Sequence, residues 1–173
     1  MPADLYTAVM SMPGADQALN FLQEQASAFA YVPSRLETFR RQLEAIRDTA
    51  AARNDTLKMA QAVAALQGLP RLQSLYASAS GKVSEVMTSI RLGTGNPLAL
   101  VPKVIGAAAQ AALVFKSVDL YDKATNKLAS GTLTAAELAR IRQGGFGATL
   151  NPTVKVVLIV GGAWLVYRLV KGR

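Results

Sequence analysis

Apolar residues recur at alternating spacings of three and four along residues 36–64, which is the clearest pattern in the chain. They are Leu36, Phe39, Leu43, Ile46, Ala50, Leu57, Ala60 and Ala64, and Arg53 occupies the same pattern as its one charged member. This spacing keeps one side of an α-helix facing a partner helix. We therefore expect one helix from Leu36 to Gln67, ended by Gly68 and Pro70.

A second run with the same spacing lies between Pro70 and Leu92. Its members are Leu72, Tyr76, Ala79, Val83, Val86 and Ile90. Two consecutive helices of this kind predict an antiparallel hairpin, and the turn at residues 93–97 ends it. The predicted helix–helix seam of this hairpin consists of Leu36, Phe39, Leu43, Ile46, Leu57, Leu72, Tyr76, Val83, Val86 and Ile90.

The residues before this hairpin predict a shorter helix from Ala15 to Tyr31, followed by Pro33 as its stop. Its shared apolar face consists of Leu19, Leu22, Ala26 and Phe29. Ser34 and Glu37 stand three residues apart before the long helix, as the two members of a capping box do. We interpret residues 1–14 as an N-terminal arm and residues 15–96 as an amphipathic helical bundle.

Residues 97–147 predict an Ala-rich apolar helix, from Leu98 to Leu128, and then a short capped helix. Val104–Phe115 carries no charge and lies between Lys103 and Lys116. Twelve residues are too few to span a bilayer, so we favour a buried core helix. The alternative is a second membrane-inserting segment, whose small-residue contact surface would be Gly106, Ala108 and Ala112.

The short helix has its own start and stop signals. Thr134 and Glu137 form a second predicted capping box, and Gly144 and Gly145 end the helix. We expect residues 144–147, Gly-Gly-Phe-Gly, to form a flexible joint before the last segment.

Residues 148–173 predict a membrane-anchor helix with a basic end. Lys155 and Arg168 flank an apolar run, where their stems can reach toward headgroups, and Trp164 and Tyr167 suit an interface. A buried assembly helix is the alternative. The predicted anchor residues are Val154, Lys155, Val156, Val157, Leu158, Ile159, Val160, Gly161, Gly162, Trp164, Leu165, Tyr167 and Arg168. The candidate lipid or phosphate contacts are Arg168, Lys171 and Arg173.

The fold class that these patterns predict is all-α: an elongated helical bundle with a coiled-coil-like hairpin and a C-terminal apolar, transmembrane helix. Composition supports this, because 51% of residues are apolar while only 6% are aromatic and 17% are charged. The net charge is +8, and residues 154–173 hold four bases and no acid. A basic end beside an apolar run fits anionic lipid, and it also fits non-specific contact with nucleic-acid phosphates.

The chain contains no Cys and no His, which removes the thiol nucleophile, the imidazole base and the commonest metal ligands. Asn126–Glu137 matches the pattern of a calcium-binding loop at three positions. Leu128 and Ser130 stand where that pattern needs carboxylate ligands, so we expect no calcium site there. Arg35, Arg40, Arg41 and Arg47 form a basic stripe, interleaved with acids. We expect no enzyme activity, no cofactor, no metal and no small-molecule substrate.

In overall style the chain resembles small virion-associated membrane proteins and DNA-ejection proteins of bacteriophages, with Ala-rich amphipathic helices and one terminal apolar segment. This resemblance implies a structural virion component in a virion membrane or interior, or in a bacterial inner membrane. Its implied partners are membrane lipid and further copies or other subunits of a large assembly. The alternatives are an oligomeric conduit for DNA ejection and a soluble adaptor whose last helix docks on a partner.

Overall fold

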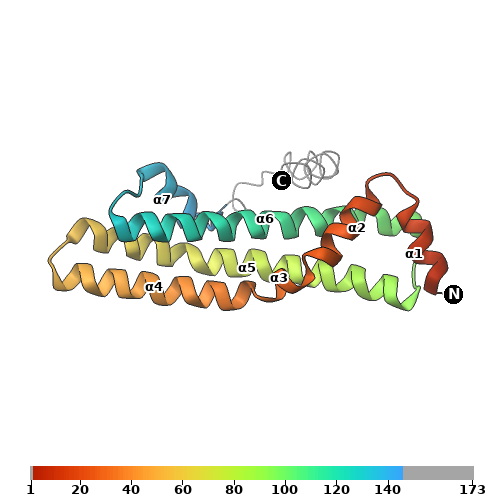
Figure 1. The fold of residues 1–173 in the computed structure, drawn as a ribbon, viewed down its shortest axis with the longest axis horizontal. Helices are drawn as coiled ribbons and strands as arrows, with labels where there is room; N and C mark the ends of the chain where they lie inside the picture. The colour runs from red at the N-terminus through yellow and green to blue at the C-terminus, as the bar shows by residue number, and fades with distance from the viewer. Residues whose placement is uncertain (1, 146–173) are drawn as a thin grey trace. The chain divides into compact units, whose positions relative to one another are not determined.

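The computed structural model describes residues 2–145, and this part of the chain is helical with no strand (Figure 1). The predicted all-α class is therefore confirmed. The predicted C-terminal anchor, residues 148–173, lies outside the described residues. The helices are α1 (Pro2–Met10), α2 (Ala15–Glu24), α3 (Ala26–Ala30), α4 (Val32–Ala52), α5 (Thr56–Leu92), α6 (Pro97–Ser130) and α7 (Ala135–Arg142).

The chain divides into two compact units. Among the described residues, the first unit comprises 2–29 and 77–112, and the second comprises 30–76 and 113–145. The two long helices, α5 and α6, contribute residues to both units. Each unit has its own core. The charged residues are concentrated in the second unit, whose described residues include twelve bases and seven acids. Those of the first unit include three bases and four acids.

The core of the second unit forms where α4, the first part of α5 and the last part of α6 pack together. Buried residues recur with the three–four spacing on all three helices, so each helix presents one continuous apolar side. On α4 they are Leu36, Phe39, Leu43 and Ala50; on α5 they are Ala62, Ala65, Leu69 and Leu72; on α6 they are Val114, Val118, Tyr121, Thr125 and Leu128.

The predicted helix from Leu36 to Gln67 is wrong, because the chain reverses at Arg53–Asp55 between α4 and α5. Asn54 adopts the left-handed conformation with φ 56°, which Asn tolerates better than most residues. The carboxylate of Asp55 then accepts a hydrogen bond from the Lys58 N–H at 3.0 Å, so it caps the start of α5. Arg53 is the residue that ends α4, not a member of a seam.

The predicted stop at Gly68 and Pro70 is also wrong, because α5 runs through both residues. A proline inside a helix removes one backbone hydrogen bond and costs about 3 kcal/mol. Packing outweighs that cost here, since Leu69 and Leu72 on either side of Pro70 are buried at 4% and 0% exposure. Tertiary contacts therefore keep α5 helical where the local sequence favours an end.

The first unit packs α1 and α2 with residues 77–92 of α5 and 97–112 of α6. The predicted arm contains α1, and its Leu5 and Val9 are buried. The predicted helix from Ala15 to Tyr31 is interrupted at Gln25, between α2 and α3. Leu19, Leu22 and Phe29 are buried as expected, but Ala26 is exposed because this interruption changes the helical phase.

The two predicted capping boxes have opposite outcomes. The one at Ser34 and Glu37 is wrong: α4 begins at Val32, so Ser34 lies inside its first turn. Pro33 is tolerated there because the first turn needs no backbone donor. The capping box of Thr134 and Glu137 is confirmed at the start of α7, with both reciprocal hydrogen bonds present.

Candidate functional site

The residues of the predicted hairpin seam separate into three groups by burial. Leu36, Phe39, Leu43, Leu72, Val86 and Ile90 are buried. Ile46, Tyr76 and Val83 are half-buried. Leu57 is 69% exposed, which corrects its assignment to the seam. The turn at Asn54 restarts the helical phase, so the buried side of α5 begins at Ala62 and Ala65 rather than at Leu57.

Within residues 2–145, one helix is long and apolar enough to cross a membrane, and it is α6. Half of its most apolar window of 18 residues is buried. Val104, Ala107 and Ala111 lie in the core, as expected of a core helix. Ile105, Gly106, Gln110, Leu113 and Phe115 remain partly exposed, so the less-buried side of this uncharged stretch is apolar apart from Gln110.

Tyr121 of α6 is the centre of contacts with α4, α5 and α7 in the core of the second unit. Its ring stacks on Phe39 with 6.1 Å between centroids, and its hydroxyl donates a hydrogen bond to the Ile141 carbonyl. Burial raises the pKa of this hydroxyl, so it stays protonated at neutral pH. Gly68 lies at the same point, where a Cβ would be 1.8 Å from the Ile141 carbonyl oxygen.

The expected flexible joint at residues 144–147 is corrected at its first two positions. Gly144 and Gly145 are buried with φ of 83° and 80°, a conformation that favours glycine. A Cβ on Gly144 would lie 2.6 Å from Arg71, and one on Gly145 would lie 2.6 Å from Ser117. These two glycines are therefore packed in place; residues 146 and 147 lie outside the described part.

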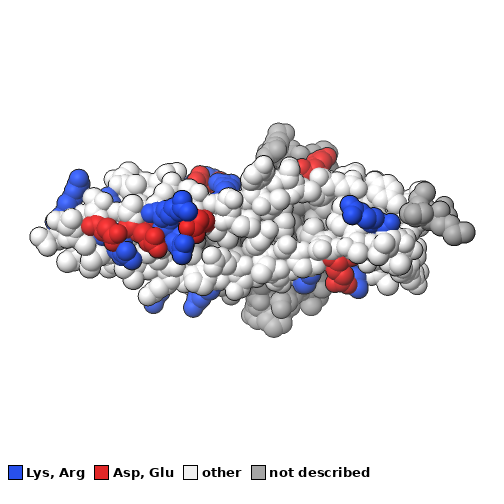
Figure 2. Space-filling view, turned by 90° about the horizontal axis from the view of Figure 1, so that it is seen from below, with Lys and Arg blue, Asp and Glu red and all other residues white. Residues whose placement is uncertain are grey.

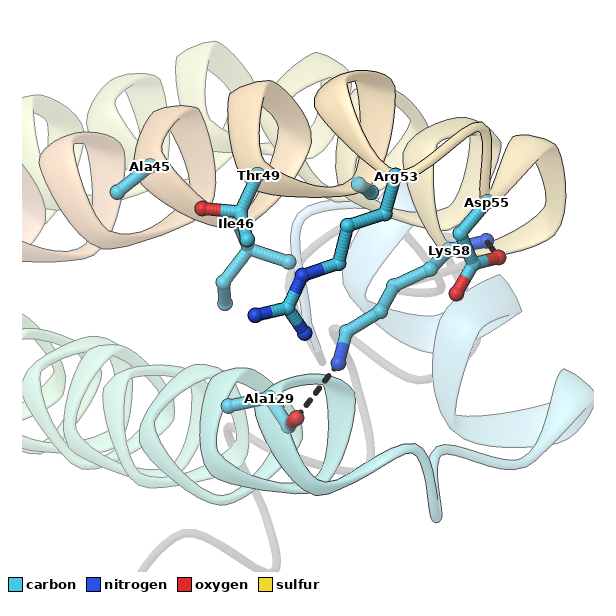
Figure 3. A pocket seen from close by; sticks show the side chains of 8 residues that line it. Ala45, Ile46, Thr49, Arg53, Asp55, Lys58 and Ala129 are labelled. Carbon is cyan, nitrogen blue, oxygen red and sulfur yellow. Dashed lines mark hydrogen bonds between the residues drawn. The ribbon is translucent and has the colours of Figure 1, made fainter.

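A pocket of about 310 Å³ lies in the second unit beside the α4–α5 turn (Figure 3). Its lining combines an apolar wall with three charged side chains: Ala45, Ile46, Thr49, Ala50, Arg53, Asp55, Lys58 and Ala129. The Lys58 ammonium donates a hydrogen bond to the Ala129 carbonyl at 2.6 Å, and the Arg53 guanidinium extends into the same space. Arg53 lies at the C-terminus of α4, and Lys58 extends from the first turn of α5 to the C-terminus of α6, so each base offsets the partial negative charge of last carbonyls.

The basic stripe of α4 is interleaved with acids that bind it. Glu37 accepts hydrogen bonds from Arg40 and Arg41 at 2.8 and 3.1 Å, chiefly from Arg40, and these lower the pKa of Glu37. Arg47 pairs with Asp48 at 2.8 Å. Figure 2 shows the two signs of charge side by side on this face rather than a field of one sign. Contact of this stripe with nucleic-acid phosphates stays a prediction.

The calcium-loop-like string at residues 126–137 serves as a turn and helix cap. Glu137 binds the Lys127 ammonium and the main-chain N–H and hydroxyl of Thr134. These contacts, with Lys127 the strongest, lower the pKa of Glu137 to about 2. No group of three or more acidic side chains that could hold a metal ion occurs within residues 2–145.

Sequence reasoning missed an apolar surface at the turn between α5 and α6. Leu92 and Leu98 are 63% and 71% exposed, and no other large apolar residue in the described part of the first unit is exposed. The signal that could have found it is the absence of charge from residue 92 to residue 102, between Arg91 and Lys103.

No protein-family model, curated protein or solved structure matches this chain. The resemblance in style to bacteriophage virion and DNA-ejection proteins therefore stays a prediction. The predicted anchor residues from Val154 to Arg168, and the basic contacts Lys171 and Arg173, lie outside the described residues, so they also stay predictions.

Proposed function

We propose that this protein is a non-enzymatic, membrane-associated assembly protein that holds a helical bundle at a lipid surface. The observation that carries the proposal is helix α6, whose apolar stretch is only half buried by the bundle. Helices on the surface of a soluble bundle normally carry charged residues on the uncovered side. From Val104 to Phe115, α6 carries none.

The sequence beyond the described residues supports the same function by a separate route. Val154–Val170 is apolar apart from Lys155 and Arg168 near its ends, and Lys171 and Arg173 follow. Bases at the ends of an apolar segment can extend toward anionic headgroups while the segment occupies the bilayer.

Of these two apolar segments, the C-terminal one is the better anchor. Val104, Ala107 and Val114 of α6 are fully buried, so placing α6 in a bilayer would first require the bundle to open. Opening exposes the apolar sides of the other helices as well, which costs the stability gained by packing them. In the proposed arrangement α6 therefore stays in the bundle, with its partly exposed apolar side toward the lipid surface, and residues 148–173 enter the membrane.

Vesicle flotation of the full-length chain tests this function. The protein should float with vesicles of phosphatidylcholine and phosphatidylserine, and less with phosphatidylcholine alone. Trp164 is the only tryptophan in the chain, so its emission reports on the C-terminal segment alone and should shift to the blue on binding.

A charge within the apolar run provides the matched variant. Val160→Arg should greatly reduce flotation, because an arginine at the centre of a membrane helix costs about 2.5–3.5 kcal/mol. Circular dichroism should show unchanged helix content. A wild-type chain that stays out of the lipid fraction at low salt and remains soluble without detergent would reject the membrane function in favour of a soluble adaptor.

A further inference from the structure

The α5–α6 turn, residues 92–98, presents two leucines to solvent. Leu92 is the last residue of α5 and Leu98 the second of α6, and they are 63% and 71% exposed. Leu92 and Leu98 lie outside the core. Their neighbours Ile90 and Leu100 are the residues that pack into it, at 8% and 4% exposure. Leu92 and Leu98 are the large apolar residues that the described part of the first unit leaves exposed, which makes the turn the place in that unit to look for a contact.

The turn that carries these leucines has well-defined backbone hydrogen bonds. Gly93 has φ of 63°, and the N–H groups of Gly93 and Thr94 donate to the carbonyls of Ile90 and Ser89 at 3.2 and 3.0 Å. This pair of bonds is the Schellman arrangement that ends a helix. The last carbonyls of α5 are therefore partly satisfied within the turn itself.

Asn96 provides hydrogen-bond acceptors for the first main-chain N–H groups of α6. Its side-chain oxygen accepts a hydrogen bond from the Leu98 N–H at 3.0 Å. Its carbonyl accepts from the N–H groups of Ala99 and Leu100 at 3.0 and 3.1 Å. A turn whose backbone groups are paired internally can enter a less polar medium at a smaller cost than an open loop.

The parts of α5 and α6 beside the turn carry a net positive charge, while the other acids of the first unit, Asp4, Asp16 and Glu24, lie on α1 and α2. Residues 77–112, which are the end of α5, the turn and the start of α6, hold Lys82, Arg91 and Lys103 against one acid, Glu85. Lys103 and Glu85 form an ion pair at 2.7 Å. The bases nearest to the leucines, Arg91 and Lys103, stand on either side of eleven uncharged residues. Apolar residues flanked by bases match the surface of an anionic bilayer.

Two leucine side chains cover far less than the about 800 Å² per partner that a stable protein interface needs. Insertion of two side chains into lipid needs no such minimum buried area when another segment already holds the chain at the membrane. The turn then meets the bilayer at a high effective concentration, so a weak second contact can form. We propose that the α5–α6 turn is a second, shallow membrane contact that inserts Leu92 and Leu98 into an anionic bilayer surface. This proposal rests on the membrane association proposed above.

Site-specific labelling of the full-length chain tests the contact directly. The chain has no cysteine, so Leu98→Cys provides a single site for an environment-sensitive fluorophore. Leu57→Cys is the matched control, since Leu57 is equally exposed at 69% but lies in the second unit. With phosphatidylcholine–phosphatidylserine vesicles, the label at position 98 should shift to the blue and be quenched by lipid-borne quenchers. The label at position 57 should not change.

A double variant without a label provides the second measurement. Leu92→Ser combined with Leu98→Ser should weaken vesicle binding about tenfold, whereas Leu57→Ser should leave it unchanged. Because all three leucines are exposed, the thermal midpoints should stay close to that of the wild type. Normal flotation with an unchanged label at position 98 would reject the turn contact and leave the proposed function standing.

Two other outcomes would also overturn the turn contact. Loss of flotation by the wild-type chain would reject the proposed function and this contact together. A shift of the label at position 98 that depends on protein concentration and needs no vesicles would assign the turn to contact between copies of the chain, not to lipid.

Discussion

Tyr121 on α6 donates a hydrogen bond to the main-chain carbonyl of Ile141 on α7, with 2.5 Å between the two oxygens. Tyr121 is fully buried. The Ile141 carbonyl also accepts a hydrogen bond from the Gly144 N–H at 2.9 Å. The Tyr121 bond joins two residues that lie twenty positions apart in the sequence, on α6 and α7.

Removing this hydroxyl should destabilise the second unit. Tyr121→Phe should lower the free energy of unfolding by about 0.5–1.5 kcal/mol, because the Ile141 carbonyl loses one of its two donors and keeps the Gly144 N–H. Chemical denaturation would measure it. Tyr31→Phe is the control, since Tyr31 is 68% exposed. Equal effects of the two variants would contradict the role given to Tyr121.

The same hydroxyl predicts a loss of stability in alkaline solution. Burial raises the pKa of Tyr121 above its ordinary value of 10.0. Its contribution to stability is therefore complete below pH 10 and is lost as the pH rises through the raised pKa of the folded state. The thermal midpoint of the wild type should fall more steeply above pH 10 than that of Tyr121→Phe. Parallel curves would show that another group controls alkaline unfolding.

Replacing two glycines of α5 by alanine, one at a time, should change the stability of the protein in opposite directions. Gly68→Ala places a Cβ 1.8 Å from the Ile141 carbonyl oxygen and 2.1 Å from the Tyr121 hydroxyl, so it should cost about 1–3 kcal/mol or more. Gly81 has no atom within 4 Å of such a Cβ. Gly81→Ala should therefore stabilise the helix by about 0.5–1 kcal/mol. Urea unfolding of both variants would give the two signs.

The turn between α4 and α5 depends on one left-handed residue. Asn54→Ala should destabilise the protein by about 1 kcal/mol, because an alanine at φ 56° brings its Cβ close to the following carbonyl. Asn54→Gly should be neutral or slightly stabilising, since glycine adopts this conformation without strain. A stability of Asn54→Ala equal to that of Asn54→Gly would contradict the position of the turn.

Acid should weaken the cap of α7. The Lys127 ammonium and the two Thr134 donors lower the pKa of Glu137 from 4.5 to about 2. The stability from this carboxylate is therefore present above pH 4.5 and is lost as the pH falls toward 2. Glu137→Gln should flatten the fall in thermal midpoint over that range. Glu24→Gln, at an exposed carboxylate on α2, is the control and should flatten it less.

The sequence predicts well those elements whose local signals agree with their packing. The side of α5 from Leu72 to Ile90 is buried or half-buried at every predicted position. The bounds of α6 differ from the prediction by one residue at its start and two at its end. Thr134 and Glu137 cap α7 because both members of the motif stand directly before an apolar run.

The errors arise where packing outweighs local propensity. Arg53–Asp55 contains neither Gly nor Pro, yet the chain reverses there, and the spacing from Ala50 to Leu57 continues the helical pattern only by coincidence. Gly68 and Pro70 look like a helix end. In the structure, Gly68 provides the room that Tyr121 and Ile141 need. No property of the local sequence distinguishes a glycine required by a distant helix from one that ends its own helix.

The close packing of Gly144 and Gly145 also determines where the rest of the chain begins. Because Arg71 and Ser117 pack against these glycines, the described part of the chain ends at a fixed position in the second unit. A pulling force applied to the chain beyond Gly145 would reach α7 first, before the long helices bear any load. The contacts of α7 with Tyr121 and Gly68 would therefore be the first to resist that force.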